Sequence, residues 1–357
     1  MLLAGDVGGT KTLLGLFDTS TGRRPAPISL HTYATADYPS FAAILDAFAR
    51  DLRDASAASV VEGQGSSAVP SAVEGPVPRV VGGPARRVVQ GIEAAAVGVA
   101  GPVVGASARL TNITWDISAA EIAAACGTSR VQLMNDLEAM ANSVEVLEGD
   151  ELLVLQEGVP RADGNAAVIA AGTGLGQAYL HRHGEWLIPV PSEGGHADFA
   201  ARSDREIQLV KMLREQYGRA EIEQVLSGPG LLNIYRFTHR GGECDMLDGG
   251  GDPAARVSQA GLTGRCQQCV EALRMFVSAY GAEAGNLALR GVATAGLYVG
   301  GGIAPKILPM LKGNLFMDAF LAKVPMNELI ARIPVRIILN PDAGLVGAAV
   351  RAQQIAV

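Results

Sequence analysis

The chain has 357 residues, of which 48% are hydrophobic and 18% are charged, and its formal net charge is −7. This length exceeds that of one compact domain, so we expect two domains with large buried cores. The acidic balance, without a long Lys/Arg cluster, argues against nucleic acid or an anionic membrane as a partner, and the lack of an apolar spanning segment or a visible signal peptide predicts a soluble cytoplasmic protein.

The first motif, GDVGGTKT near the N-terminus, differs from a P-loop because Thr10 stands where the second glycine belongs. A P-loop continues into a helix, but the next residues, KTLLGLF, are bounded by the turn cluster DTSTG. The segment therefore predicts a strand, a glycine turn and a second strand. In such a hairpin Gly8 and Gly9 let backbone amides approach an anion, Thr10 adds a hydroxyl, and Asp6 is a candidate to hold Mg²⁺ through water. An ordinary hairpin with a Gly-Gly turn is the alternative.

Two segments that follow give little chemical information. Residues 55–90 are rich in Ala, Gly, Ser, Pro and Val, which predicts a surface loop inserted into the first domain. The stretch LTNITW at 110–115 places polar residues in a turn without indicating their role.

A candidate for catalysis lies in VQLMNDLEAMANSVEVLE at 131–148. The segment starts like a strand and continues with helical spacing of apolar residues. Asn135 and Asp136 therefore fall at a strand-to-helix junction. Both residue types are also favoured as plain helix N-caps, so the pattern leaves a capping role open beside a catalytic one.

The second half of the chain repeats the plan of the first hairpin. NAAVIAAGTGLGQAYLH at 165–181 predicts a strand, a turn formed by Gly172, Thr173 and Gly174, and another strand. Its glycines do not fit the dinucleotide fingerprint, because no helical pattern follows. A third glycine run, LYVGGGIAPK, ends another strand, and its Gly301 is a candidate to lie against a nucleotide base. Three such clusters suggest a nucleotide held between related halves.

The stretch PSEGGHADF gathers Glu193, His196 and Asp198 in a loop too short for a regular helix. A metal site there needs a further ligand from elsewhere. Binding of sugar hydroxyls fits better, because Glu and His together offer acceptors and a donor. EQVLSGPG, which begins at Glu223, is a further polar turn.

Four cysteines are too few for a disulfide framework in a chain of this length. Cys266 and Cys269 form one C-x-x-C pair, while Cys126 and Cys244 are single in the sequence. A zinc site needs about four ligands. The helical spacing of apolar residues around the pair favours thiols packed toward a core over a metal or redox site.

Together the motifs resemble the bacterial glucokinases, whose fold is that of the actin-like ATPases. The resemblance implies an α/β fold of two ribonuclease H-like domains around a central cleft. The implied domains are residues 1–146 plus 342–357, and residues 147–341. The motifs that carry it follow the family's order along nearly the whole chain: GDVGGT, TNITW, NDLEAMA, AAGTGLGQA, EGGHADFA, VLSGPG, GNLAL, GGGIAPK and NPDAGLVGAA.

The same resemblance assigns roles to individual residues. Asp136 becomes the general base, and Asn135 its sugar-binding neighbour. The remaining implied sugar contacts are Glu193, His196, Glu223 and Asn112. The implied ATP-binding segments are Gly5, Asp6, Val7, Gly8, Gly9 and Thr10 in the first half, and Gly172, Thr173 and Gly174 in the second.

The implied activity is that of a glucokinase, a transferase that phosphorylates glucose at its 6-hydroxyl at the start of glycolysis. ATP is the donor, Mg²⁺ bridges its phosphates, and a homodimer is expected. Phosphoryl transfer depends mainly on positioning and charge neutralisation, so backbone amides and Mg²⁺ matter as much as the base. Two alternatives stay open: a kinase for another hexose or an N-acetylhexosamine, and a non-catalytic sugar sensor on the same fold.

Overall fold

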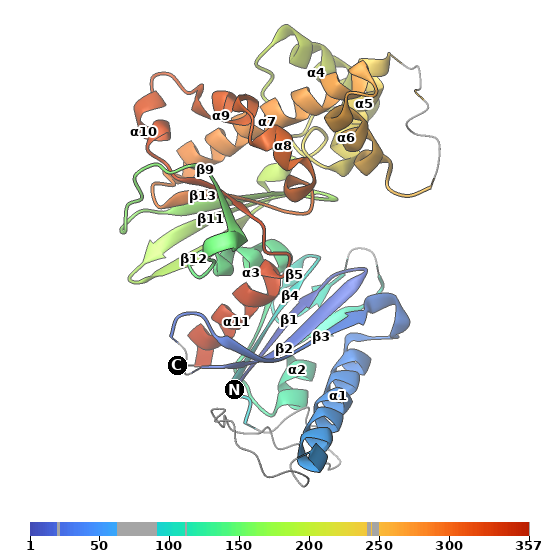
Figure 1. Ribbon diagram of the computed structural model, residues 1–357, viewed down its shortest axis with the longest axis vertical. Coiled ribbons are helices and arrows are strands. Elements are labelled where there is room, and N and C mark those ends of the chain that lie inside the picture. Colours follow the sequence, from blue (N-terminus) through green and yellow to red (C-terminus); the bar gives the residue numbers. More distant parts are fainter. Residues whose placement is uncertain (20–21, 63–90, 111–112, 241–243, 245–249, 357) are drawn as a thin grey trace. The chain divides into compact units, whose positions relative to one another are not determined.

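A computed structural model describes residues 1–19, 22–62, 91–110, 113–240, 244 and 250–356 (Figure 1). The chain forms two compact units. Unit 1 contains Met1–Val146 and Pro341–Val357, and unit 2 contains Leu147–Asn340. Among the described residues, no helix combines the length and the apolar character that crossing a membrane requires.

Unit 1 is built on a five-stranded sheet with the order β3-β2-β1-β4-β8. Strand β1 pairs antiparallel with β2 and parallel with β4, and β4 pairs parallel with β8. The predicted strand, glycine turn and strand at the N-terminus are therefore confirmed. The sheet strands are β1 (Leu2–Val7), β2 (Lys11–Asp18), β3 (Ala26–Ala34), β4 (Ala94–Val99) and β8 (Val131–Asn135); a small second sheet holds β5 (Val103–Val104), β6 (Ser107–Arg109) and β7 (Asp116–Ser118).

The alternation of side chains along β1 determines which face of the sheet Asp6 occupies. Leu3 and Val7 lie in the core cluster that also contains residues of α1 (Phe41–Glu62) and α2 (Ala119–Cys126). Leu2 and Ala4 lie in the cluster that contains residues of α3 (Asp136–Ser143) and α11 (Ala343–Ala356). Asp6 continues this second series, so its carboxylate lies on the face covered by α3 and α11.

Helices α3 and α11 pack closely because α11 is rich in small residues. A Cβ added at Gly347 would collide with the carbonyl oxygen of Ala139 on α3. The glycine therefore permits a separation that no other residue allows, and it fixes the position of the helix that begins at Asp136.

Helix α1 corrects one prediction. Residues 55–62, expected to begin a surface loop, form the last two turns of α1 (Phe41–Glu62). Their run of Ala, Ser and Val carries no Gly or Pro, so nothing in it stops a helix that has already begun. The rest of the predicted insertion, 63–90, lies outside the described residues.

Unit 2 repeats the sheet plan of unit 1, with one more strand at its edge. Its order is β12-β11-β10-β13-β14-β9, in which β10 pairs antiparallel with β11 and parallel with β13. The predicted second hairpin is confirmed. The strands are β9 (Leu152–Gln156), β10 (Ala166–Ala171), β11 (Leu175–His183), β12 (Trp186–Ser192), β13 (Gly296–Gly300) and β14 (Val335–Ile338).

A large apolar cluster joins this sheet to the helices of unit 2, and the long helix α7 contributes more than any other element. Its fully buried aromatic residue Tyr280 lies edge-on to Phe276 and to Phe316. The helices are α4 (Asp204–Tyr217), α5 (Gly228–His239), α6 (Pro253–Thr263), α7 (Gln267–Gly291), α8 (Leu308–Leu311), α9 (Asn314–Leu321) and α10 (Asn327–Ala331).

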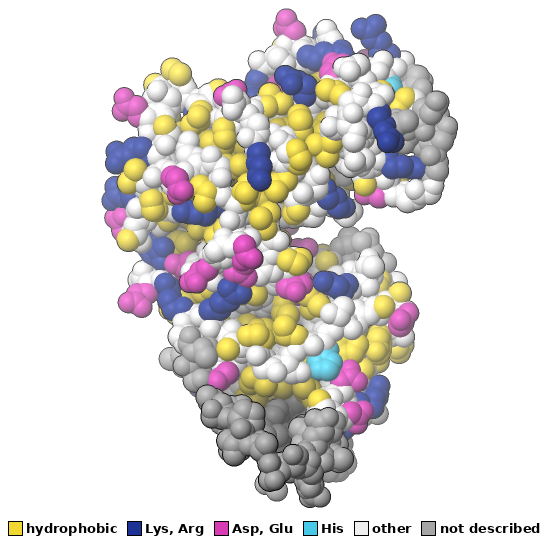
Figure 2. Space-filling model, in the orientation of Figure 1, with side chains coloured by type: hydrophobic (Ala, Val, Ile, Leu, Met, Phe, Trp, Pro, Cys, Tyr) yellow, Lys and Arg dark blue, Asp and Glu magenta, His cyan; other side chains and the backbone are white. Residues whose placement is uncertain are grey.

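Charged side chains of both signs are interspersed with apolar and neutral ones on the face that Figure 2 shows. Among the described residues on this face, no broad field of a single sign is visible. The distribution agrees with the modest net charge of −7.

Candidate functional site

Asp136 stands at the predicted strand-to-helix junction. Strand β8 ends at Asn135 and α3 begins at Asp136. Asn135 is the N-cap: its Oδ1 accepts a hydrogen bond of 2.8 Å from the amide of Leu137. Oδ1 of Asp136 accepts from the same amide, also at 2.8 Å. The capping role that the sequence left open is thus real for Asn135. Asp136 is the first residue of α3, and its other carboxylate oxygen, Oδ2, takes no part in the contact with Leu137.

The electrostatics of Asp136 balance two opposing effects. The residue is exposed, yet enough protein surrounds its carboxyl for desolvation to raise its pKa above the usual value. Hydrogen bonds from the amide of Leu137 and from Asn135 act in the opposite direction. The position at a helix N-terminus favours the ionised form, but here burial has the larger effect. A carboxylate of raised pKa is a better proton acceptor than an ordinary surface aspartate.

Asp6 is the second perturbed carboxyl group of unit 1. Burial, followed by the negative charge of Asp136, raises its pKa to about 6. Lys11 opposes this shift, and Asp342 adds to it. Nζ of Lys11 lies 3.4 Å from Oδ1 of Asp342. A Cβ added at Gly344 would lie 2.7 Å from Oδ2 of Asp6, so the start of α11 is close to this carboxylate. Three carboxylates and one lysine therefore gather near the end of β1, the starts of β2 and α3, and the residue before α11.

The turn between β1 and β2 is held by its own backbone and by one threonine. The amide of Gly8 donates to the carbonyl of Lys11 at 2.9 Å, and the hydroxyl of Thr35 donates to the carbonyl of Gly8 at 2.8 Å. The side chain of Val7 is buried in the core. A Cβ at Gly5 would lie 3.0 Å from Leu14, so Gly5 serves strand packing. Within the predicted segment Gly5–Thr10, the turn and Asp6 are the parts left available to a ligand.

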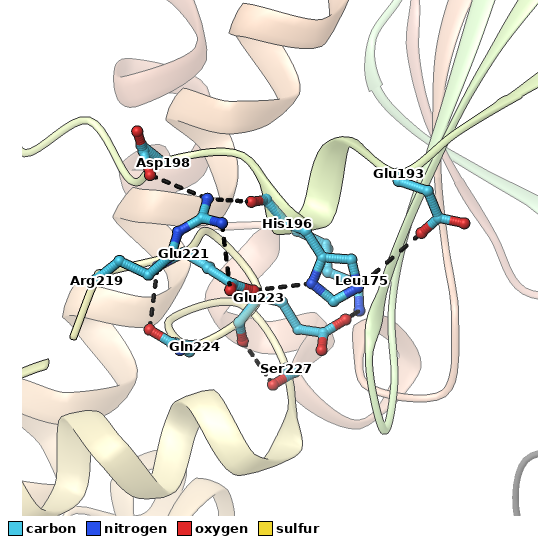
Figure 3. Close-up of polar contacts among 9 residues, drawn as sticks. All are labelled: Leu175, Glu193, His196, Asp198, Arg219, Glu221, Glu223, Gln224 and Ser227. Atoms are coloured by element: carbon cyan, nitrogen blue, oxygen red, sulfur yellow. Dashed lines mark hydrogen bonds and ion pairs between the residues drawn. The ribbon is translucent and has the colours of Figure 1, made fainter. Parts of the chain in front are cut away.

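In unit 2 the loop around His196 forms a polar network (Figure 3). Nδ1 of His196 lies 2.8 Å from Oε2 of Glu221, and its Nε2 lies 4.0 Å from Oε2 of Glu193. The hydrogen bond with Glu221 is the main cause that raises the pKa of His196. Arg219 in turn donates to the carbonyl of His196 and to Asp198. The imidazole is thereby held in one orientation, with the largely exposed carboxylate of Glu193 beside it.

Glu223 connects this network to the predicted second phosphate loop. Its Oε2 accepts a hydrogen bond of 2.8 Å from the amide of Leu175, the residue directly after Gly174. At the other end of the loop, the amide of Gly228 donates to the carbonyl of Gly172 at 2.8 Å. Because Gly228 is the first residue of α5, the loop adjoins a helix N-terminus, a position suited to anions.

The two glycines after Glu193 explain how these groups come together. A Cβ at Gly195 would overlap the carbonyl oxygen of Leu175, so only glycine fits between the His196 turn and the start of β11. The amide of Glu223 donates to the carbonyl of Gly195 at 2.8 Å. The short 3₁₀ turn Gly194–His196, the loop before β11 and the segment of Glu223 thus form one connected site in unit 2.

Gly301 and Asn112 are the last two residues that the sequence predicts at the site. Gly301 follows β13 with φ +84°, and a Cβ there would collide with the backbone of Ala171, directly before the loop that starts at Gly172. It therefore borders the same loop, and close backbone packing alone explains its identity. Asn112 lies outside the described residues.

Comparison with known proteins then identifies the family. A family model described as Glucokinase matches residues 3–355. The chain belongs to the glucokinase family. It is 36% identical over 374 residues to the glucokinase of Nostoc punctiforme, with 99% of each chain covered. It is similar to the crystal structure of a glucokinase from an Antarctic psychrotroph, with a TM-score of 0.79, 27% identity and 99% and 98% of the two chains covered.

A more distant fold likeness is to a ROK family glucokinase from Streptomyces griseus, crystallised with glucose and AMPPNP. The TM-score is 0.58 at 22% identity, with 99% of each chain covered. The fold of this glucokinase-family chain is that of the actin-like ATPase sugar kinases, as the sequence predicted.

Sequence reasoning missed several groups of this glucokinase-family site. Glu221 lies two residues before the predicted Glu223. Its contact with His196, at 2.8 Å, is shorter than the 4.0 Å contact of Glu193. Asp342 belongs to the motif NPDAGLVGAA, whose pattern indicates no role for this carboxylate. Lys11 is part of the first glycine motif and forms the ion pair with Asp342. The partner of Lys11 lies 331 positions away in the sequence, so no local pattern indicates this ion pair.

Asp6 fits the expected role toward Mg²⁺. Among the described residues, no compact cage of protein ligands includes it. Magnesium usually keeps several waters and takes only one or two carboxylates, so such a cage is not required. Burial is the main cause of the raised pKa of Asp6, and the negative charge of Asp136 adds to it. A cation near Asp6 would relieve that repulsion.

Proposed function

We propose that the chain transfers the γ-phosphoryl group of ATP to the 6-hydroxyl of D-glucose, giving glucose 6-phosphate and ADP. The observation that carries this proposal is the carboxylate of Asp136, of raised pKa, at the start of α3 in a chain of the glucokinase family. In the reaction, a bond forms between the 6-oxygen and the γ-phosphorus. The bond from that phosphorus to the bridging oxygen of ADP breaks, and Asp136 takes the hydroxyl proton.

The proposed base matches the needs of an alcohol nucleophile. A sugar hydroxyl is weakly nucleophilic at neutral pH, and a positioned carboxylate that accepts its proton contributes about 10² to 10⁴ in rate. Asn135, whose Oδ1 already caps α3, retains an amide group whose contact with the carbonyl of Gly101 is long, at 3.4 Å. We infer that this amide binds a sugar hydroxyl without competing for the proton.

Sugar recognition in unit 2 is assigned to Glu193, His196 and Glu223. The exposed carboxylate of Glu193 offers acceptors, and Nε2 of His196 is its ring nitrogen not bound to Glu221. Glu223 holds the amide of Leu175 with Oε2, which leaves Oε1 as a further acceptor. A set dominated by acceptors suits a ligand with several vicinal hydroxyl donors.

Phosphate binding is assigned to the two glycine turns. Gly8 to Thr10 lie in unit 1, and Gly172 to Gly174 lie beside the N-terminus of α5 in unit 2. Mg²⁺ bound at Asp6 through water would neutralise phosphate charge as it redistributes. Asn112 is a further proposed sugar contact, because it belongs to the motif TNITW.

A coupled assay of ADP formation over a panel of sugars tests the proposed activity. The panel contains glucose, mannose, fructose, galactose and N-acetylglucosamine, with 6-deoxyglucose as the matched control that lacks only the acceptor hydroxyl. We expect the highest kcat/KM for glucose, glucose 6-phosphate as the product, and no turnover of 6-deoxyglucose. A higher kcat/KM for another sugar would transfer the proposal to that hexose. Glucose binding without ADP formation would support a sensor.

We also propose that the protein acts in the cytoplasm as a homodimer and supplies glucose 6-phosphate to glycolysis. The basis is its resemblance to the bacterial glucokinases along nearly the whole chain. Light scattering on the purified protein tests the assembly. The expected mass is twice the chain mass of 36.9 kDa, and a monomer at all concentrations would contradict it.

A further inference from the structure

Four potential metal ligands of unit 2 lie close together, and none of them is among the groups assigned to phosphoryl transfer. They are His239, Cys244, Cys266 and Cys269, and their ligand atoms all lie within 4.8 Å of one another. His239 is the last residue of α5, Cys266 is the N-cap of α7, and Cys269 lies in the first turn of α7. The fold thus gives the C-x-x-C pair the two partners that it lacks in the sequence.

Two of the separations between ligand atoms lie close to the edge lengths of a zinc tetrahedron. With Zn–S bonds of about 2.3 Å and Zn–N bonds of about 2.0 Å, tetrahedral ligands lie about 3.5 to 3.8 Å apart. Sγ of Cys244 is 4.0 Å from Sγ of Cys269, and Sγ of Cys266 is 3.4 Å from Nε2 of His239. Movements of a few tenths of an ångström would bring these two edges to tetrahedral values, and the other ligand atoms lie within 4.8 Å of one another.

The imidazole of His239 is already oriented as a metal ligand. Its Nδ1 lies 2.8 Å from the carbonyl oxygen of Tyr235, one helical turn earlier. A carbonyl only accepts, so Nδ1 carries the hydrogen, and the lone pair is on Nε2, which faces Cys266. Metal-binding histidines characteristically make such a hydrogen bond with their other nitrogen. The ring of His239 also packs on that of Tyr235, with centroids 3.9 Å apart.

Tyr235 supports a second ligand as well. Its hydroxyl accepts a hydrogen bond of 3.1 Å from the amide of Cys244 and points its own hydrogen at Sγ of Cys244, 3.6 Å away. A donor aimed at sulfur stabilises a thiolate, which is the form that binds metal. Cys269 is fully buried, and the other three ligands are partly buried, so little water reaches the cluster.

We propose that His239, Cys244, Cys266 and Cys269 bind one Zn²⁺ in a structural site. Three thiolates and one imidazole are the ligand set of closed, tetrahedral zinc sites, which keep no open position for a substrate. The ion joins the end of α5, Cys244 and the start of α7. Because α5 begins beside Gly172, the ion also anchors the far end of the helix that borders the proposed phosphate loop.

The test is the metal content of the full-length protein after removal of any histidine tag. We expect about one zinc per chain by mass spectrometry of metals, retained through dialysis against a mild chelator. Cys244→Ser and Cys266→Ser should lose the metal under the same conditions. Cys126→Ala, which alters a buried cysteine of unit 1 outside the cluster, should keep it. Protein without stoichiometric zinc, even after purification with added Zn²⁺, would overturn the proposal.

Cobalt exchange keeps the proposal testable if a ligand variant does not fold. Wild-type protein loaded with Co²⁺ should show thiolate-to-cobalt charge transfer and the intense visible bands of tetrahedral coordination. His239→Cys should retain one metal ion with an altered spectrum. Weak, octahedral-type bands in the wild type would contradict the site, and so would a disulfide between Cys244 and Cys269 in freshly purified protein.

Discussion

Replacing Asp6 with asparagine should make unit 1 more stable at neutral and alkaline pH. The pKa of Asp6 is raised from 3.8 to about 6, mainly by burial and then by the charge of Asp136. One pKa unit corresponds to 1.36 kcal/mol, so ionising this group in the folded chain costs about 3 kcal/mol at pH 8. Because the folded-state pKa is raised, the cost is present above pH 6 and disappears as the pH falls toward 4. Asp6→Asn should therefore stabilise by about 1 to 3 kcal/mol at pH 8 and by nearly nothing at pH 4.

The two tryptophans allow this to be measured on unit 1. Trp115 is buried in unit 1, and Trp186 lies on β12 in unit 2. In a Trp186→Phe background, urea unfolding followed by fluorescence reports on unit 1, and the exposed Asp37→Asn serves as the control. Equal stability of the Asp6→Asn variant and its parent at pH 8, or a gain that persists at pH 4, would refute the reasoning. The variant should also lose most glucokinase activity if Asp6 holds Mg²⁺.

Three further predictions concern how the site is positioned. Gly347→Ala should destabilise unit 1 by about 1 to 3 kcal/mol and lower kcat, because the added Cβ meets the carbonyl of Ala139 and displaces α3; unchanged urea unfolding would contradict this. Glu221→Gln should lower the pKa of His196, because the carboxylate is the main cause of its raised value; an unmoved imidazole NMR titration would contradict this. Glu223→Ala should raise KM for glucose more than it lowers kcat, so equal effects on both would argue against sugar contact.

Local pattern was sufficient to predict the hairpins and the junction before α3. Each glycine turn separates two short apolar runs, and Asn135 precedes helical spacing, so the relevant information lies within about ten residues. The loop prediction failed at residues 55–62 because composition alone does not show where a helix already under way will end.

Contacts between distant segments were beyond local pattern. Glu221 becomes a partner of His196 only because the segments around Asp198 and Glu221 pair as a bridge. Cys244 has no neighbouring cysteine or histidine in the sequence that forms a motif with it. Its partners in the fold are His239 at the end of α5 and Cys266 and Cys269 at the start of α7. Cys269 is buried in the core, and Cys266 packs against that core from the N-cap of α7, as the helical spacing predicted. The preference for core thiols over a metal site stays an untested prediction, and the zinc proposal takes the opposite view.

The most direct test of the proposed mechanism compares Asp136→Asn with the wild type in kcat and in glucose affinity measured by calorimetry. The substitution keeps the shape and removes the proton acceptor. Glu138→Gln, on the same helix, is the control for the loss of one carboxylate. The account predicts that kcat of Asp136→Asn falls by at least about 10²-fold while glucose affinity changes little. A normally folded Asp136→Asn variant that retains most of its turnover would contradict it.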